Sequence, residues 1–147
     1  MSHATETKVS DIAPLRRGAR QEAILFAAHP AAGFPAPADD LVERALDIND
    51  LVVKNPASTF FVRVQGDSME GAGIFSGDVL VVDRSIEPKD GTIVVAAVYG
   101  ELVVKRLRKN GTIHTLVSEN EEYEPIVVSE NDDCYIWGAV VGSVRQF

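Results

Sequence analysis

The stretch from Thr59 to Ser85 constrains the fold more than any other part of the sequence. Its first residues alternate between two kinds of side chain, which is the period of a β-strand with two different faces. Gly66-Asp67 ends this strand as a turn, and Gly77-Asp78 is a second turn. The apolar run that follows, Val79 to Val82, is typical of a buried strand. The stretch therefore predicts strand, turn and strand, with Ser68 directly after the first turn.

The rest of the chain after residue 59 also alternates between apolar runs and turn residues. Tyr99-Gly100 and Asn110-Gly111 fit hairpin turns, and Asp90-Gly91 ends another segment. We expect strands at about 59–65, 79–83, 92–98, 101–108, 112–118, 126–129 and 134–145. Several short strands with few helices predict a mainly-β fold in a single compact domain.

The first third of the chain gives weaker signals. Residues 1 to about 20 show no sustained period, which predicts a flexible, irregular arm. Residues 21–28 form a short apolar patch, and His29-Pro30 ends any helix there. Asp39 or Asp40 can cap a short helix, whose apolar stripe would consist of Leu41, Val42, Ala45 and Leu46.

Composition narrows the class of protein. The 147 residues are 46% hydrophobic and 24% charged, which is ordinary for a globular protein. No apolar run is long enough for a membrane span or a signal peptide, so we expect a cytoplasmic location. The single Cys134 lies in an apolar strand pattern, which indicates a buried and unreactive thiol.

The net charge of −8 argues against nucleic acid as the main direct ligand. Residues 1–32 carry a net charge of +1, whereas residues 33–147 carry −9. A solvated surface explains most of this acidity, including the loop from Glu119 to Glu124. A protein partner with a basic groove is the sharper alternative.

Lys105 is a candidate base for the hydroxyl of Ser68. Strand alternation places Lys105 on the same face as Val103 and Leu107. An ammonium ion is poorly solvated in such surroundings, and a neutral lysine amine can take the proton from a serine hydroxyl. The structural alternatives are a turn-capping serine and a lysine that reaches solvent at a sheet edge.

Three motifs in order resemble the LexA/UmuD family of self-cleaving Ser-Lys peptidases, and most closely its UmuD branch. They are the dipeptide Ala32-Gly33 followed by Phe34-Pro35, Ser68 after Gly66-Asp67, and Lys105 after two valines. The resemblance implies the β-clip fold that this family shares with signal peptidases. It divides the chain into an arm, residues 1–32, which self-cleavage removes, and a peptidase domain, residues 33–147.

The resemblance also implies a mechanism and a role. Ser68 attacks the carbonyl of Ala32, and Lys105 is the general base. Apart from the resemblance, we expect the backbone N–H groups of Asp67 and Ser68 to form the oxyanion hole, because donors in that place usually give the largest stabilisation. Cleavage is slow until a RecA filament on single-stranded DNA promotes it. The implied partners are a second copy of the chain, a UmuC-type translesion polymerase in the SOS response, and the replicative sliding clamp.

Other kinds of site find little support in the sequence. His3, His29 and His114 are scattered and, with one cysteine, make no zinc spacing, so neither a metal nor a cofactor is expected. Asp67 and Asp78 flank turns and are expected to cap the backbone. The 32 residues before Gly33 are too few for a helix-turn-helix domain, so sequence-specific DNA binding is not expected. The alternatives are a phage-type or plasmid-type repressor fragment, a non-catalytic β-rich regulatory subunit, and a signal peptidase, whose membrane anchor is missing.

Overall fold

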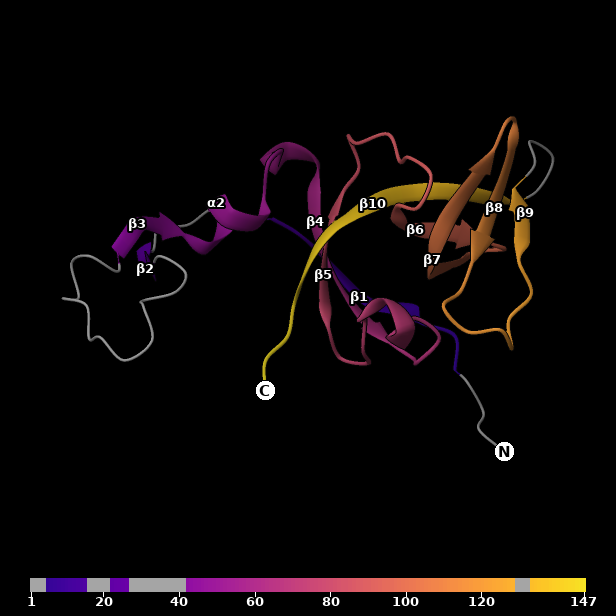
Figure 1. Ribbon diagram of the computed structural model, residues 1–147, viewed down its shortest axis with the longest axis horizontal. Helices are drawn as coiled ribbons and strands as arrows, with labels where there is room; N and C mark the ends of the chain where they lie inside the picture. Colours follow the sequence, from indigo (N-terminus) through magenta and orange to yellow (C-terminus); the bar gives the residue numbers. More distant parts are fainter. Residues whose placement is uncertain (1–4, 16–21, 27–41, 129–132) are drawn as a thin grey trace, which may run out of the picture. The chain divides into compact units, whose positions relative to one another are not determined.

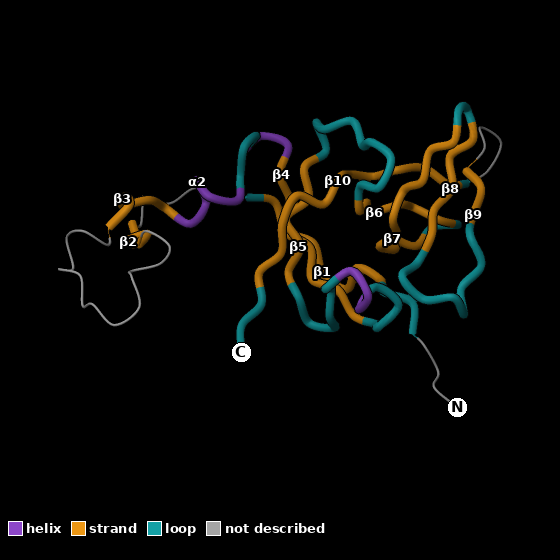
Figure 2. Tube along the Cα trace, in the orientation of Figure 1, coloured by secondary structure: helices purple, strands orange, loops and turns teal. Residues whose placement is uncertain are grey.

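A computed structural model describes residues 5–15, 22–26, 42–128 and 133–147. The chain divides into two compact units, one formed by residues 1–15 and 55–147 and the other by residues 16–54. The first unit holds a sheet of eight antiparallel strands, and helix is confined to short turns (Figure 2). The strands of this unit are β1 (Lys8–Pro14), β4 (Thr59–Gln65), β5 (Val79–Asp83), β6 (Ile93–Val98), β7 (Glu101–Asn110), β8 (Ile113–Val117), β9 (Ile126–Val128) and β10 (Cys134–Val144).

The sheet of the first unit closes on itself. Its strand order is β1-β4-β5-β10-β6-β7-β8-β9, and β1 also pairs with β7 (Figure 1). Six strands, from β1 round to β7, therefore form a closed ring, in which the second edge of β1 is paired as well. The ring is joined where Lys8 faces Val103. The mainly-β prediction is confirmed.

The apolar side chains of the strands form two separate buried clusters. One buried cluster includes Val62, Val64, Met69 and Leu80, and a second includes Leu107, Leu116 and Cys134. The predicted burial of Cys134 is confirmed. The hairpins predicted at Tyr99-Gly100 and Asn110-Gly111 join β6 to β7 and β7 to β8.

Two expectations for the first third of the chain are wrong. Lys8–Pro14 is strand β1, paired with β4, and not part of an irregular arm. Most residues of β1 are exposed, so the strand leaves no apolar alternation in the sequence. Its backbone pairs with an edge of β4 that would otherwise lack hydrogen-bond partners.

The second wrong expectation is the helix over Leu41–Leu46. Val42–Asp47 is strand β3, which pairs with β2 (Glu22–Phe26) in a separate two-stranded sheet of the second unit. A helix that short is marginal because its first turn is costly to form, whereas a ladder with a neighbouring strand satisfies both backbones. Helix begins only at α2 (Ile48–Val52). Asp39, Asp40 and Leu41 lie outside the described residues.

Candidate active site

Ser68 lies in the turn after β4 and is fully buried, with a side-chain exposure of 0%. The next residue, Met69, is also fully buried and packs in the core, and the short helix η2 (Glu70–Ala72) follows. The carbonyl oxygen of Ser68 accepts a hydrogen bond of 3.1 Å from the Glu119 N–H. The buried Met69 side chain and the hydrogen bond to the Ser68 carbonyl thus fix the backbone that carries the hydroxyl.

Lys105 lies in the middle of β7 on the face it shares with Val103 and Leu107, as predicted, and is only 2% exposed. Its ammonium donates to Ser118 Oγ at 2.7 Å and lies 5.2 Å from the ring centroid of Tyr123. It also forms an ion pair with Glu6. Lys105 is therefore not a lysine that reaches solvent at a sheet edge, which was the structural alternative.

Residues Glu6 and Thr7 connect the two predicted catalytic side chains. The Thr7 N–H donates to Ser68 Oγ at 2.8 Å, and the Ser68 hydroxyl donates to Thr7 Oγ1 at 3.1 Å. The preceding residue, Glu6, pairs with Lys105. The structure thus brings Ser68 and Lys105 to two consecutive residues of one segment. Within the described residues, each of them bonds to this segment and they do not bond to each other.

The backbone N–H groups of Asp67 and Ser68, predicted to form an oxyanion hole, converge on one acceptor. Both donate to the carbonyl oxygen of Thr5, at 2.8 and 2.9 Å. Two fixed N–H groups aimed at one carbonyl oxygen can stabilise the negative charge that this atom gains during acyl transfer.

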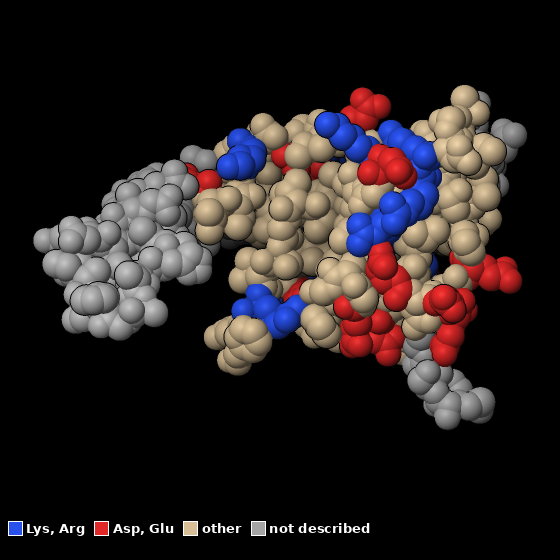
Figure 3. All heavy atoms as spheres, in the orientation of Figure 1, with Lys and Arg blue, Asp and Glu red and all other residues tan. Residues whose placement is uncertain are grey.

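Carboxylates surround this region. The pKa of the Tyr123 hydroxyl is raised by burial, and next by the negative charges of Glu6, Asp67 and Glu122. Figure 3 shows acidic side chains gathered low on the visible face, below a group of basic ones. Because the loop from Glu119 to Glu124 packs Tyr123 against Lys105 and bonds Ser68, it is more than the solvated turn expected from its acidity.

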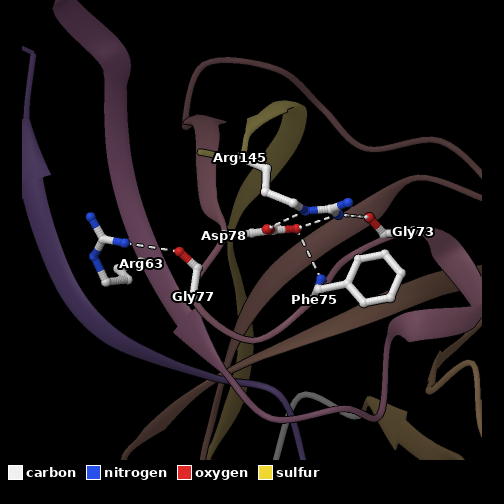
Figure 4. Close-up of polar contacts among 6 residues, drawn as sticks. All are labelled: Arg63, Gly73, Phe75, Gly77, Asp78 and Arg145. Atoms are coloured by element: carbon white, nitrogen blue, oxygen red, sulfur yellow. Dashed lines mark hydrogen bonds and ion pairs between the residues drawn. The ribbon is translucent and has the colours of Figure 1, made fainter. Parts of the chain in front are cut away.

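Asp78 has a structural role, as predicted for a turn aspartate (Figure 4). Its carboxylate accepts from the Phe75 N–H at 2.9 Å and pairs with Arg145 at 2.8 Å. The hydrogen bond from Arg145 is the main reason that the pKa of the buried Asp78 is lowered, although burial opposes it. Asp67 likewise accepts from the Thr5 N–H. Neither carboxylate is free to act as an acid.

The remaining predicted residues are placed as follows. Ala32 and Gly33 lie outside the described residues, as do His3 and His29. His114 is half-buried on β8 and lines a hollow of about 1190 Å³ that includes neither Ser68 nor Lys105. A smaller hollow of about 410 Å³ opens beside the site, lined by Thr5, Glu6, Lys8, Gln65 and Tyr123. The described ranges hold no cluster of metal-binding side chains.

Sequence reasoning missed Glu6, Thr7, Ser118 and Tyr123. Ser118 is the last residue of a predicted strand and Tyr123 follows that strand, but nothing in their spacing points to Lys105. Glu6 and Thr7 lie in a stretch without period, so only the pairing of β1 with β4 and β7 brings them to the site.

Comparisons with known proteins agree on one group of relatives. A model of the Peptidase S24-like family matches residues 25–141. Protein SamA of Salmonella typhimurium is 39% identical over 135 residues, which are 92% of this chain and 94% of SamA. Protein MucA of Escherichia coli is 39% identical over 117 residues, 79% of this chain and 80% of MucA.

A LexA repressor of Shewanella sediminis is also similar, at 40% identity over 117 residues. These are 79% of this chain but only 56% of the repressor. In the part of the chain that the structure describes, no helix has the length and apolar character that a membrane crossing needs.

Proposed function

The chain belongs to the Peptidase S24-like family, in agreement with the resemblance of its motifs to LexA/UmuD proteins, and we propose that it is a self-cleaving serine peptidase. Ser68 is the nucleophile and Lys105 the general base. One observation carries the proposal: two consecutive residues, Glu6 and Thr7, bond a buried lysine and a buried serine whose turn aims two N–H groups at a single carbonyl oxygen.

The proposed reaction cleaves the bond between Ala32 and Gly33. Ser68 Oγ bonds to the carbonyl carbon of Ala32 while the neutral amine of Lys105 takes the hydroxyl proton. The N–H groups of Asp67 and Ser68 stabilise the resulting oxyanion. The carbon–nitrogen bond then breaks, and Lys105 gives its proton to the amine of Gly33. Water hydrolyses the ester, which frees the carboxylate of Ala32 and restores the Ser68 hydroxyl.

The proposed biological role is that of an SOS mutagenesis protein of the UmuD type acting in the cytoplasm. A RecA filament on single-stranded DNA stimulates cleavage, and the shortened homodimer acts with a UmuC-type polymerase, with the sliding clamp as a further partner. The similarity to SamA along 92% of this chain favours this role over a repressor fragment. The repressor reading has one observation in its favour, the 40% identity to a LexA repressor.

The test is mass spectrometry of the purified full-length chain after incubation with RecA, single-stranded DNA and a nucleoside triphosphate. We expect a large fragment that begins Gly33-Phe34-Pro35. Ser68→Ala and Lys105→Arg should abolish it, the latter because a guanidinium group stays charged. Matched controls are Ser143→Ala on an exposed part of β10 and Lys109→Arg on the same strand as Lys105, which should cleave normally.

Each other outcome has a definite reading. A wild-type chain that stays intact, with its fold retained, favours the non-catalytic regulatory subunit. A fragment that begins elsewhere moves the scissile bond. A folded Ser68→Ala protein that still cleaves removes Ser68 as the nucleophile.

A further inference from the structure

The space between β4 and β7, called the groove below, is occupied in the uncleaved chain by a segment of the same chain. Residues 5–7 bond to the turn after β4 and to Val104 of β7, and β1 continues from them along β4. We propose that residues 5–14 are an inhibitory strand, a resident peptide ligand that must leave the groove before the Ala32-Gly33 segment can enter. This inference rests on the proposed function.

Every polar group of the proposed machinery is engaged by residues 5–7. The Thr5 carbonyl fills the space in front of the Asp67 and Ser68 N–H groups. Thr7 takes up both the lone pair and the proton of the Ser68 hydroxyl. Glu6 pairs with Lys105, and a lysine that carries its proton in an ion pair cannot accept one from a serine.

The segment is bound like a substrate but in the wrong register for cleavage. The carbonyl in the proposed oxyanion hole belongs to Thr5, whereas Ser68 Oγ is hydrogen-bonded to Thr7, two residues further along. An attacking hydroxyl should instead lie against the carbon whose oxygen occupies the hole. The segment therefore blocks the site without offering it a bond to cut.

Backbone pairing shows which class of ligand the groove takes. The Val104 N–H donates to the Thr7 carbonyl at 2.9 Å, Lys8 faces Val103, and six residues of β1 pair with β4. This is strand addition, in which main-chain bonds hold an extended peptide between two sheet edges. Here the side chains add a carboxylate for Lys105 and a hydroxyl for Ser68.

Gly66 independently shows that the groove is built around this segment. A Cβ on Gly66 would lie 2.7 Å from the Glu6 carbonyl carbon and 2.8 Å from the Thr7 Cα. The backbones of residues 6 and 7 can therefore approach the turn before Ser68 this closely only because Gly66 has no side chain. Because one extended segment fills the groove, a second segment carrying Ala32 and Gly33 has to displace it.

The first test measures the rate of self-cleavage of full-length variants. Glu6→Gln removes the charge that pairs with Lys105, and Thr7→Pro removes the N–H that bonds Ser68. Both should cleave at Ala32–Gly33 about tenfold faster or more, the effect of losing roughly 1.4 kcal/mol of binding. Glu87→Gln makes the same charge change in the exposed loop between β5 and β6 and should match the wild-type rate.

The second test does not depend on catalysis. In protein carrying Gly33→Glu, whose side chain should block cleavage at Ala32–Gly33 while Ser68 and Lys105 stay intact, amide hydrogen exchange is measured at positions 67, 68 and 104, whose N–H groups bond to Thr5 and Thr7. Adding Glu6→Gln or Thr7→Pro should speed exchange at these three amides, whereas Glu87→Gln should not.

The two tests separate this inference from the proposed function. A wild-type chain that never cleaves refutes the proposed function, and the exchange test still decides whether the strand holds the groove. Normal cleavage with unchanged rates and unchanged exchange in both variants overturns the inference. A fragment beginning at Glu6 would also overturn it, because the segment would then be a substrate.

Discussion

At the scale of single residues, Gly66 has a conformation and a neighbourhood that no other residue type fits. Its φ of +117° is strained for any side chain, and a Cβ would collide with the backbone of residues 6 and 7. We expect Gly66→Ala to lower the free energy of unfolding by about 2–6 kcal/mol, the sum of backbone strain and overpacking. Chemical denaturation of the full-length chain measures this change.

Gly77 is the matched control because it has a φ of +93° but no atom within 4 Å of a Cβ position. Gly77→Ala should therefore show only the strain of about 1–3 kcal/mol. Deleting residues 1–7 should make the two alanine variants equally unstable. If Gly66→Ala costs no more than Gly77→Ala in the full-length chain, residues 6 and 7 do not pack against Gly66.

The sequence predicts single residues well where a strand sets their direction. Alternation in β7 put Lys105 on the inner face, and the Gly66-Asp67 turn put Ser68 at the end of β4, as the structure shows. Glu6 and Thr7 could not be found in this way. Their role depends on pairing across more than 60 residues of chain, which leaves no local pattern.

At the scale of elements, the seven strands after residue 59 could be predicted to within a few residues. Each of these strands is bounded by turn residues, and most bury one face. The alternation of apolar residues and the positions of the turn residues therefore indicate the same strand ends. β1 and β3 could not be predicted. Both are short, and what makes them strands is a partner, β4 for one and β2 for the other.

Asp83 at the end of β5 joins this strand to η1 (Pro56–Ser58). It is buried, and it accepts hydrogen bonds from Asn55, Ser58 and Ser85 at 2.7–2.8 Å. Burial alone would raise its pKa, but the hydrogen bonds from Ser85, Asn55 and Ser58 together outweigh burial and lower the pKa from 3.8 to about 2.

This lowered pKa predicts a loss of stability in acid. The carboxylate of Asp83 contributes fully at pH values above 3.8, and its contribution is lost as the pH falls towards 2. Asp83→Asn should cost about 2 kcal/mol at neutral pH, and the difference from wild type should shrink over that acid range. Denaturant titrations at a series of pH values give both curves.

Asp90→Asn provides the comparison for this experiment, since Asp90 is exposed and accepts a backbone hydrogen bond from Lys109. It should keep the acid dependence of the wild type because Asp83 is intact. Parallel curves for Asp83→Asn and wild type from neutral pH down to the acid limit would contradict the assigned role of the Asp83 hydrogen bonds.

At the scale of the whole molecule, one strand closes the ring and also fills the groove. β1 lies between β4 and β7, and the residues just before it contact Ser68 and Lys105. Under the proposed function, this strand is on the arm that self-cleavage separates from the peptidase domain. Once the cleaved arm dissociates, the ring would therefore open between β4 and β7 and the groove of the product would be exposed.

Detachment of the arm should depend on protein concentration. Before cleavage the covalent link gives the arm an effective concentration on the order of millimolar, whereas afterwards only strand pairing and the contacts of residues 5–7 hold it. We expect fragments 1–32 and 33–147 to stay together at high concentration and to separate when diluted to about 1 μM, as native mass spectrometry can show. Thr7→Pro, which loses the bond to Ser68, should separate at higher concentrations than wild type.

If the arm is lost from the product even near millimolar concentration, β1 binds too weakly to hold the groove. If it stays bound through extensive dilution, cleavage alone does not free the groove and a partner must displace the strand.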